Sequence, residues 1–257
     1  MNNQEPAKTI QGKAVVLAAG KGKRLHSEAF NLPKVLREAD GQPLLMHVLH
    51  KLSFLKAGDI TIVIGYEGQK VQAEAGPAYS YVWQTEQLGT GHAVAQARPL
   101  LKDFDGPVLV CYGDSPLISQ ETYEGMFKAQ QESGDAATVL SYVTDLKLPF
   151  GRIIKDEQGH FVKVVEEKDC DAEQLKIKEL NAGVYVFDCQ ALLKALNRLE
   201  NHNAQHEYYL TDVPYLLMQD GGTVGLYQSR GQYEGLGVNT QEDLDLVSRI
   251  LHEERQA

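Results

Sequence analysis

The stretch KAVVLAAGKGKR, residues 13–24, joins a short apolar run directly to a glycine-rich, basic segment. Its first part, Lys13–Leu17, shows no alternation of polar and apolar residues, which is typical of a strand buried on both faces in a parallel sheet. In an open α/β sheet, ligands bind beyond the carboxyl ends of the strands, where glycines let backbone N–H groups approach a phosphate. The stretch therefore predicts an α/β fold with an anion-binding loop after its first strand.

Two familiar phosphate-binding patterns do not fit this loop. A dinucleotide-binding fingerprint requires a third glycine where Leu25 stands, and a P-loop requires a Gly-Lys-Ser/Thr sequence that is absent. The first mismatch argues against a nicotinamide-dependent oxidoreductase. A solvated basic turn is the plain alternative for the loop.

Working outward, two more continuous apolar runs follow the first, Ile60–Ile64 and Val108–Tyr112. Between them lie patterns with one apolar face at helical spacing, one beginning at Pro43 and another extending from Ala93 to Leu101. Buried strands that alternate with amphipathic helices predict a mostly parallel sheet covered on both faces.

The pattern changes after about residue 135, where helices interrupt the strands less often. Further strands are predicted at Ala136–Val143, Arg152–Lys155, Phe161–Glu167 and Glu179–Phe187, and helices near Ala191–Arg198 and Asp212–Gln219. This part is expected to be more antiparallel. The sequence Thr240–Asp243 has the form of a capping box and predicts a last helix. We therefore expect a polar tail (1–12), one domain (13–239) with two halves that meet near residue 135, and a C-terminal helix (240–257).

Charge and cysteine content narrow the class of protein. The 25 Lys and Arg against 35 Asp and Glu give a net charge of −10, which argues against general binding to nucleic acid or to anionic membranes. The three scattered cysteines form neither a disulfide framework nor a metal knuckle. No run approaches the ~20 apolar residues of a membrane span, and the polar first twelve residues show no signal peptide. We expect a cytoplasmic protein.

Two more residues are candidates for a phosphate site. Lys34, stiffened by Pro33, can bring a point charge to a phosphate, although such a residue is more often an ordinary surface lysine. Asp114 follows Gly113 at the end of the third apolar run. An Asp there suits Mg²⁺, which needs only one or two protein oxygens and completes its shell with phosphate and water.

Taken together, these residues and several later motifs resemble the sugar nucleotidyltransferases. In particular, the chain is similar to the uridylyltransferase domain of the bacterial bifunctional N-acetylglucosamine-1-phosphate uridylyltransferases over residues 13–239. The more specific motifs are Glu86–Ala93 and Asn203–Asp212, supported by Phe150–Ile153, Glu166–Asp169, Asn181–Gly183 and Gly237–Asn239. The resemblance implies a Rossmann-like, glycosyltransferase-A-like nucleotidyltransferase fold, with a mostly parallel sheet and an antiparallel sugar-binding part.

The resemblance also implies a role for individual residues. Arg24 and Lys34 would be catalytic and hold the triphosphate, while Asp114 and Asn239 would bind Mg²⁺. The nucleotide would be held by Leu17, Ala18, Ala19, Gly20, Gln84, Gly89 and Thr90, and Gln84 would read the uracil edge. The sugar phosphate would be held by Gly113, Gly151, Glu166, Asn181, Tyr209 and Thr211. The implied reaction converts UTP and N-acetylglucosamine 1-phosphate into UDP-N-acetylglucosamine and pyrophosphate.

The sequence departs from the family pattern at several places. They are Lys23 for a usual Thr, a longer loop around Glu28–Asn31, Ala182 for Thr, His206 for Gly, and Thr240–Asp243 in place of Asn/Asp-Arg. Two alternatives stay open: a nucleotidyltransferase for another base or sugar 1-phosphate, and a regulator that binds sugar nucleotides without turnover. Because simple binding does not require Arg24, Lys34, Asp114 and Asn239 together, their presence favours an enzyme.

The bifunctional relatives carry an acetyltransferase built from six-residue repeats, and the 257 residues contain no such repeat. We therefore expect no acetylation of glucosamine 1-phosphate, no trimer formed through a β-helix, and a monomer or weak dimer. The chain is either a stand-alone enzyme or a piece cut at a domain boundary. The departures at Glu28–Asn31 and Thr240–Asp243 favour the first.

Overall fold

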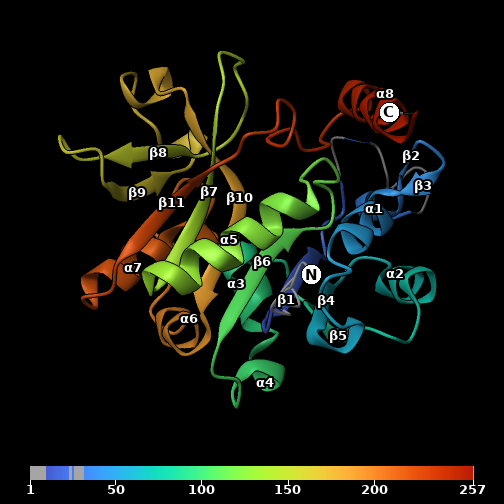
Figure 1. Ribbon diagram of the computed structural model, residues 1–257, viewed down its shortest axis with the longest axis horizontal. Coiled ribbons are helices and arrows are strands. Elements are labelled where there is room, and N and C mark those ends of the chain that lie inside the picture. The colour runs from blue at the N-terminus through green and yellow to red at the C-terminus, as the bar shows by residue number, and fades with distance from the viewer. Residues whose placement is uncertain (1–9, 23–24, 26–31, 257) are drawn as a thin grey trace, which may run out of the picture.

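The computed structural model describes residues 10–22, 25 and 32–256. Its centre is a mixed sheet in the order β11-β7-β10-β6-β1-β4-β5, with β8 and β9 attached at the side of β10 (Figure 1). The strands are β1 (Lys13–Ala18), β4 (Ile60–Ile64), β5 (Ser80–Trp83), β6 (Pro107–Tyr112), β7 (Ala137–Val143), β8 (Arg152–Lys155), β9 (Phe161–Val165), β10 (Glu179–Asp188) and β11 (Val224–Gln228).

The two halves of the sheet differ in strand direction, as expected. Strands β5, β4, β1 and β6 run parallel, and β1 at their centre pairs on both sides, so that Val16 lies opposite Ile62 and Cys111. Strand β10 is antiparallel to both β6 and β7, and the β8–β9 hairpin is antiparallel as well. Strand β11 pairs with β7 in parallel. The predicted α/β fold, with a parallel first part and a more antiparallel second part, is confirmed.

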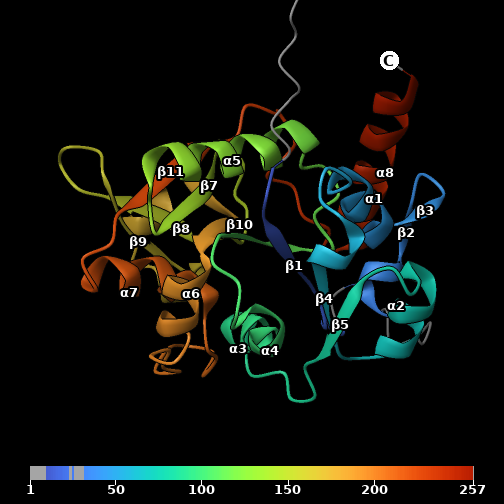
Figure 2. The same cartoon turned by 60° about the horizontal axis from the view of Figure 1, so that its bottom comes forward.

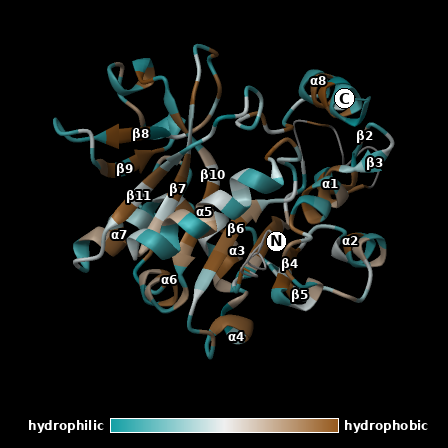
Figure 3. Cartoon of the chain, viewed as in Figure 1, coloured by the Kyte–Doolittle hydropathy of each residue, from teal (hydrophilic) through white to brown (hydrophobic). Residues whose placement is uncertain are grey.

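Helices cover both faces of this sheet, as the two views in Figures 1 and 2 show. One face carries α1 (Leu44–Lys51), α2 (Gly68–Ala75) and α5 (Gln120–Ser133), and the other carries α3 (Thr90–Ala95), α4 (Arg98–Leu101), α6 (Cys189–Ala195) and α7 (Val213–Gln219). Each face has its own apolar cluster against the strands, and the strands form the apolar interior in Figure 3. Single turns of 3₁₀-helix lie at Lys34–Leu36, Ala57–Asp59, Glu167–Asp169, Gln174–Lys176 and Leu210–Asp212.

The last helix, α8 (Gln241–Gln256), forms a third apolar cluster away from the main sheet. It lies beside the small hairpin of β2 (Glu38–Ala39) and β3 (Gln42–Pro43). Its buried residues Leu244, Val247, Ile250 and Leu251 pack with Leu25, Ala39, Leu44, Leu117, Leu236 and Val238. The helix therefore joins segments that come from both ends of the chain.

One predicted helix differs in the structure. The apolar spacing from Ala93 to Leu101 predicts a single helix, whereas α3 ends at Ala95 and α4 begins at Arg98. The reason is Pro99, whose ring would clash with the carbonyl group four residues earlier and whose nitrogen has no proton to donate. The elements β5, β11, α2 and α5 were not predicted. In the described part of the chain, no helix combines the length and the apolar character needed to cross a membrane.

Candidate active site

A cavity of about 900 Å³ lies beyond the carboxyl ends of β1, β4 and β6. Its wall includes the glycine-rich loop (Gly20–Gly22), Lys34, Gln84, Gln87, Asp114, Glu207 and Asn239. The loop after β6 is drawn against β1 by a hydrogen bond from Gly113 N to Leu17 O of 3.0 Å. The parallel strands thus end at one common edge, where the fold class predicts ligand binding.

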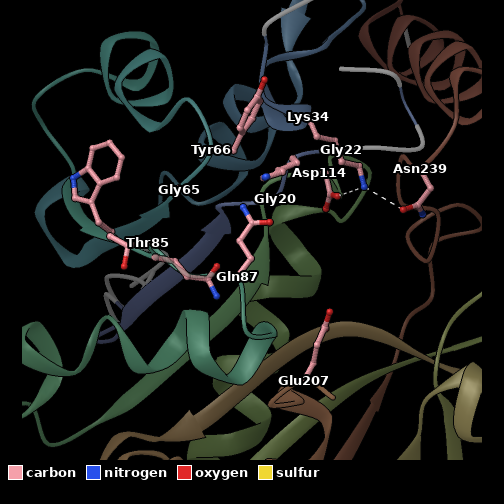
Figure 4. A pocket seen from close by; sticks show the side chains of 13 residues that line it. Gly20, Gly22, Lys34, Gly65, Tyr66, Thr85, Gln87, Asp114, Glu207 and Asn239 are labelled. Atoms are coloured by element: carbon pink, nitrogen blue, oxygen red, sulfur yellow. Dashed lines mark hydrogen bonds and ion pairs between the residues drawn. The ribbon is translucent and has the colours of Figure 1, made fainter. Parts of the chain in front are cut away.

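Three polar residues meet at one end of this cavity (Figure 4). Lys34 makes an ion pair with Asp114, and its Nζ donates a hydrogen bond of 3.1 Å to Oδ1 of Asn239. Lys34 lies on the 3₁₀ turn after Pro33, Asp114 follows β6, and Asn239 precedes α8. Three residues that the sequence analysis singled out are therefore neighbours, although 205 positions separate Lys34 from Asn239.

A second cavity of about 290 Å³ opens on the other side of the same three residues. It is lined by residues of the antiparallel half, among them Phe150, Gly151, Glu166, Asn181 and Gly183. Lys34, Asp114 and Asn239 line both cavities. The arrangement is that of two ligand sites with one cationic and two oxygen-bearing side chains at their junction.

Gln84 is held firmly at the end of β5. Its side-chain nitrogen donates a hydrogen bond of 3.0 Å to the carbonyl oxygen of Gly89 and lies 3.1 Å from Nδ1 of His92. The side chain of Gln96 contacts Nε2 of the same imidazole ring, at 3.1 Å. Gln84 is 5% exposed and lines the first cavity. These contacts hold the buried amide in one orientation.

The segment Glu86–Ala93 links the glycine-rich loop to the segment Asn203–Asp212. Gln87 Nε2 donates a hydrogen bond of 2.8 Å to Ala19 O, next to the glycine-rich loop. Gly89 has φ +112°, and a Cβ atom there would lie 2.6 Å from Tyr208 O, so only glycine fits. Tyr208 N in turn donates to Leu88 O at 2.8 Å. The two most specific motifs of the sequence therefore form one unit.

In the second cavity, Glu166 and Asn181 are fixed by neighbours. Thr211 Oγ1 donates a hydrogen bond of 3.0 Å to Oε1 of Glu166. Asn181 Nδ2 donates to Tyr185 OH at 2.7 Å, and Asn181 Oδ1 accepts from Gly183 N at 3.2 Å. Both side chains therefore have one preferred position in the wall of the second cavity.

Burial perturbs two carboxyl groups here. Loss of solvent raises the pKa of Glu166, opposed by the hydrogen bond from Thr211 and reinforced by the charge of Asp212. Burial also raises the pKa of Asp212, to about 6, with a further contribution from Asp169. Desolvation disfavours the ionised form of an acid, which is why both pKa values lie above the usual range.

The remaining predicted site residues take different positions. Leu17, Ala19, Gly20, Gly89 and Thr90 surround a smaller recess between the two cavities, and Thr90 Oγ1 accepts a hydrogen bond of 3.0 Å from Leu210 N. Ala18 packs in the core, and Gly113 touches Leu45 and Val35 rather than the cavities. Tyr209 and Thr211 are buried and are not among the residues that line the second cavity, and Tyr209 OH accepts a hydrogen bond of 2.9 Å from Gln205. Arg24 lies outside the described residues.

The sequence analysis did not assign four residues that shape the site: Gln87, His92, Tyr112 and Glu207. Gln87 and His92 hold other site residues, Tyr112 lies between the recess and the second cavity, and Glu207 faces the first cavity across from Asp114 (Figure 4). All four lie inside motifs that had been noticed. The motifs therefore point to these four residues, but the sequence does not show in which direction each side chain points.

The Asp114 and Asn239 oxygens suit a metal ion. Both already contact a cation, the ammonium group of Lys34, so their oxygens converge on a point where positive charge is stabilised. Carboxylate and amide oxygens are the donors that Mg²⁺ accepts, together with substrate phosphate and water. Over residues 10–22, 25 and 32–256, no cluster of three or more His, Cys, Asp or Glu side chains offers a different metal site.

Fold and site define a nucleotidyltransferase. A family model described as the MobA-like NTP transferase domain matches residues 14–208, and the chain belongs to that family. Nucleotidyltransferases of this kind generally use a divalent metal ion.

Among similar proteins, the chain matches the bifunctional protein GlmU of several bacteria. The identity is 43% over 240 residues with the protein of Heliobacterium modesticaldum and 41% over 244 residues with that of Bacillus cytotoxicus. Each match covers 93% of this chain and 52% of the relative, so the chain spans about half the length of the curated relatives it matches. The resemblance expected from the motifs is confirmed.

A solved structure supports the fold. A Bacillus anthracis protein, described as a glucose-1-phosphate thymidylyltransferase and solved in complex with sucrose, superposes with a TM-score of 0.75. The match covers 93% of this chain and 95% of that chain at 19% identity. The predicted nucleotidyltransferase fold is therefore confirmed.

Proposed function

We propose that this protein is a uridylyltransferase that forms UDP-N-acetylglucosamine and pyrophosphate from UTP and N-acetylglucosamine 1-phosphate. One observation carries the proposal: Lys34, Asp114 and Asn239 line both cavities, and Lys34 contacts the other two where the cavities meet. A nucleoside triphosphate in the first cavity and a sugar phosphate in the second would bring their phosphates together at this point.

The chemistry requires little more than positioning and charge. An oxygen of the sugar phosphate attacks the α-phosphorus, and the bond from that phosphorus to the departing pyrophosphate breaks. This nucleophile is already anionic at neutral pH, so no side chain has to remove a proton. Catalysis then depends on holding the two phosphates in line and on neutralising their charge.

Each charged residue has a part in that scheme. Lys34 turns from Asp114 to the phosphates, and Arg24, by resemblance, stabilises the charge that builds up on the leaving pyrophosphate. Asp114 and Asn239, whose oxygens converge on the Lys34 ammonium group, would hold Mg²⁺, which would screen the negative charge of the phosphate oxygens. The other described residues of the junction orient these groups.

Base choice is assigned to Gln84. Because Gly89 O and His92 Nδ1 take both N–H groups of its amide, its Oε1 would accept a hydrogen bond from the N–H group of uracil, while backbone groups would donate to the uracil carbonyl oxygens. A wrong base leaves a buried polar group without a hydrogen-bond partner, and this costs binding free energy. A cytosine in this position would therefore be rejected. On the other side, Glu166 and Asn181 would bind sugar hydroxyl and amide groups.

The test is a pyrophosphate-release assay with the purified chain. Each of UTP, CTP, ATP, GTP and dTTP is combined with Mg²⁺ and a panel of sugar 1-phosphates. The expected result is highest kcat/KM for UTP with N-acetylglucosamine 1-phosphate. Faster turnover of another pair would change the assigned substrate, and a chain that binds sugar nucleotides without any turnover would be a regulator.

Two further expectations belong to the proposal: a cytoplasmic enzyme, and a monomer or weak dimer. The oligomeric expectation is checked by light scattering, and a stable trimer would contradict it. Thiol release from acetyl-CoA with glucosamine 1-phosphate tests for the acetyl transfer that we do not expect of these residues.

A further inference from the structure

Asn239 lies in a segment without regular structure, between β11 and α8. The position of its side-chain oxygen therefore depends on what holds the backbone around it. On the amino-terminal side, Val238 N donates a hydrogen bond of 3.2 Å to Asp114 O, which ties the segment to the loop after β6. The two residues proposed as metal ligands are thus connected through the backbone.

On the other side, the backbone is held by one carboxylate. Oδ2 of Asp243 accepts hydrogen bonds from both Asn239 N and Thr240 N, each of 2.8 Å. In return, Asp243 N donates to Thr240 Oγ1 at 3.1 Å. This is the predicted capping box, with Asp243 in the place where Glu or Gln is more common. The Asp243 carboxylate does more than a capping box requires. It also accepts a hydrogen bond from the backbone N–H group of Asn239, the residue before Thr240.

Asp243 itself has a rigid support. It lies in the first turn of α8, and the next residue, Leu244, is buried in the cluster that also contains Val238 and Leu117. A negative charge at a helix amino terminus is favoured by the helix dipole. The carboxylate is therefore a fixed point from which the Asn239 backbone is held.

Precise placement of the Asn239 side-chain oxygen matters for binding a metal ion. Mg²⁺ demands near-ideal octahedral geometry at 2.0–2.1 Å. Only two side-chain torsions separate the Asn239 oxygen from its backbone, so a displaced backbone displaces the ligand. Groups that orient metal ligands generally affect metal affinity by about 10- to 100-fold.

From these contacts we infer that Asp243 is a positioning residue for metal binding: it fixes the Asn239 backbone so that the side-chain oxygen meets Asp114 at the cation site. The inference rests on the part of the proposed function that assigns Asp114 and Asn239 to a divalent ion. It makes α8 part of the active site, although the matched family model ends at residue 208.

The experiment measures Mn²⁺ binding to the full chain by electron paramagnetic resonance, which needs neither nucleotide nor sugar. Asp243→Ala should raise the Kd for Mn²⁺ by about tenfold, the lower end of the range for groups that orient ligands. The matched control is Glu242→Ala, which removes a carboxylate from the same helical turn at an exposed position. It should leave the Kd unchanged. Should Asp243→Ala fail to fold, Asp243→Leu, which also removes both acceptor oxygens, replaces it.

A double-mutant cycle separates positioning from a general loss of stability. In a chain that already carries Asn239→Ala, Asp243→Ala should change the Kd no further, because the ligand it positions is gone. Hydrogen exchange at the Asn239 and Thr240 amides should accelerate in Asp243→Ala and not in Glu242→Ala.

Each other outcome has a definite meaning. If Asn239→Ala weakens Mn²⁺ binding and Asp243→Ala does not, the inference is overturned and the proposed function stands. Equal, additive losses in the cycle overturn it as well, because Asp243 would then act independently of Asn239. If neither the parent chain nor Lys34→Met, which removes the competing ammonium group, binds Mn²⁺, or if Asn239→Ala has no effect, the metal assignment falls and the inference with it. If the Kd values for Mn²⁺ change as expected in the variants but the protein shows no uridylyl transfer, the proposed function is refuted and the inference stands.

Discussion

The ammonium group of Lys34 lies between the Asp114 carboxylate and Oδ1 of Asn239, 3.1 Å from the latter. All three side chains are partly buried, with 14% of the Lys34 side chain and 21% of the Asp114 side chain exposed. A lysine thus lies in the place proposed for the metal ion. Binding of the ion must displace it, and the phosphates of a substrate offer it a new partner.

This relationship predicts opposite effects of one substitution. Lys34→Met should tighten Mn²⁺ binding to the free protein, because the ion no longer competes with an ammonium group. The same variant should lose turnover by about 10²-fold or more, the scale of one lost transition-state stabiliser. Electron paramagnetic resonance and pyrophosphate release measure the two effects. Lys21→Met is the matched control, since Lys21 lines the same cavity but contacts the ring of Tyr66. Unchanged Mn²⁺ affinity in Lys34→Met would contradict the competition.

Asp114→Asn tests the charge of the proposed metal site. The amide keeps the shape of the side chain but removes the negative charge, so turnover should fall by at least about 10²-fold. Raising the Mg²⁺ concentration should recover part of the loss, because the remaining oxygens bind the ion more weakly. Rates are measured by pyrophosphate release over a Mg²⁺ series. A variant that keeps the parent rate would show that Asp114 is not a ligand.

His92→Ala tests the support of the base-reading amide. Without the imidazole ring, Gln84 keeps its bond to Gly89 O but loses the contact with His92 Nδ1, so its orientation is less restricted. The ratio of kcat/KM for UTP over CTP should fall several-fold, and Gln84→Ala should lower it further. Gln72→Ala, at an exposed position on α2, is the control. An unchanged UTP preference in Gln84→Ala would remove the base assignment.

Asp212 predicts a pH dependence of stability. Burial raises its pKa from 3.8 to about 6, so the folded state binds the proton more tightly than the unfolded state does. The free energy of unfolding therefore decreases as the pH rises from about 4 to about 6, and below that window the penalty is absent.

Asp212→Asn should consequently stabilise the protein at pH 7.5 and have a much smaller effect at pH 4.5. Urea unfolding at the two pH values measures both free energies. Asp103→Asn is the control, because the side chain of Asp103 is 88% exposed. Its effect on the free energy of unfolding should be the same at both pH values. Equal effects of Asp212→Asn at both pH values would mean that burial does not perturb this carboxyl group.

Local patterns were enough for several parts of this molecule. Ile60–Ile64 was predicted as a buried strand and is β4, because a strand covered on both faces needs an unbroken apolar run. The capping box at Thr240–Asp243 was predicted because its bonds span only three residues. By contrast, the sequence does not predict α5 or β11. Helix α5 is amphipathic and strand β11 is half-buried, and both depend on neighbouring elements for their apolar contacts.

The sequence by itself determined the fold class, the glycine-rich loop and the list of candidate residues, because burial, helix caps and turns depend on residues close together in the chain. Only the tertiary structure decided that β10 lies between β6 and β7, that Asn239 meets Lys34, and that the Asp243 carboxylate reaches back to the Asn239 amide. A sequence pattern shows that a residue is buried or polar but not which partner it finds. Those partners are selected when strands pair and helices pack across more than 200 residues, as at the contact between Lys34 and Asn239 with its separation of 205.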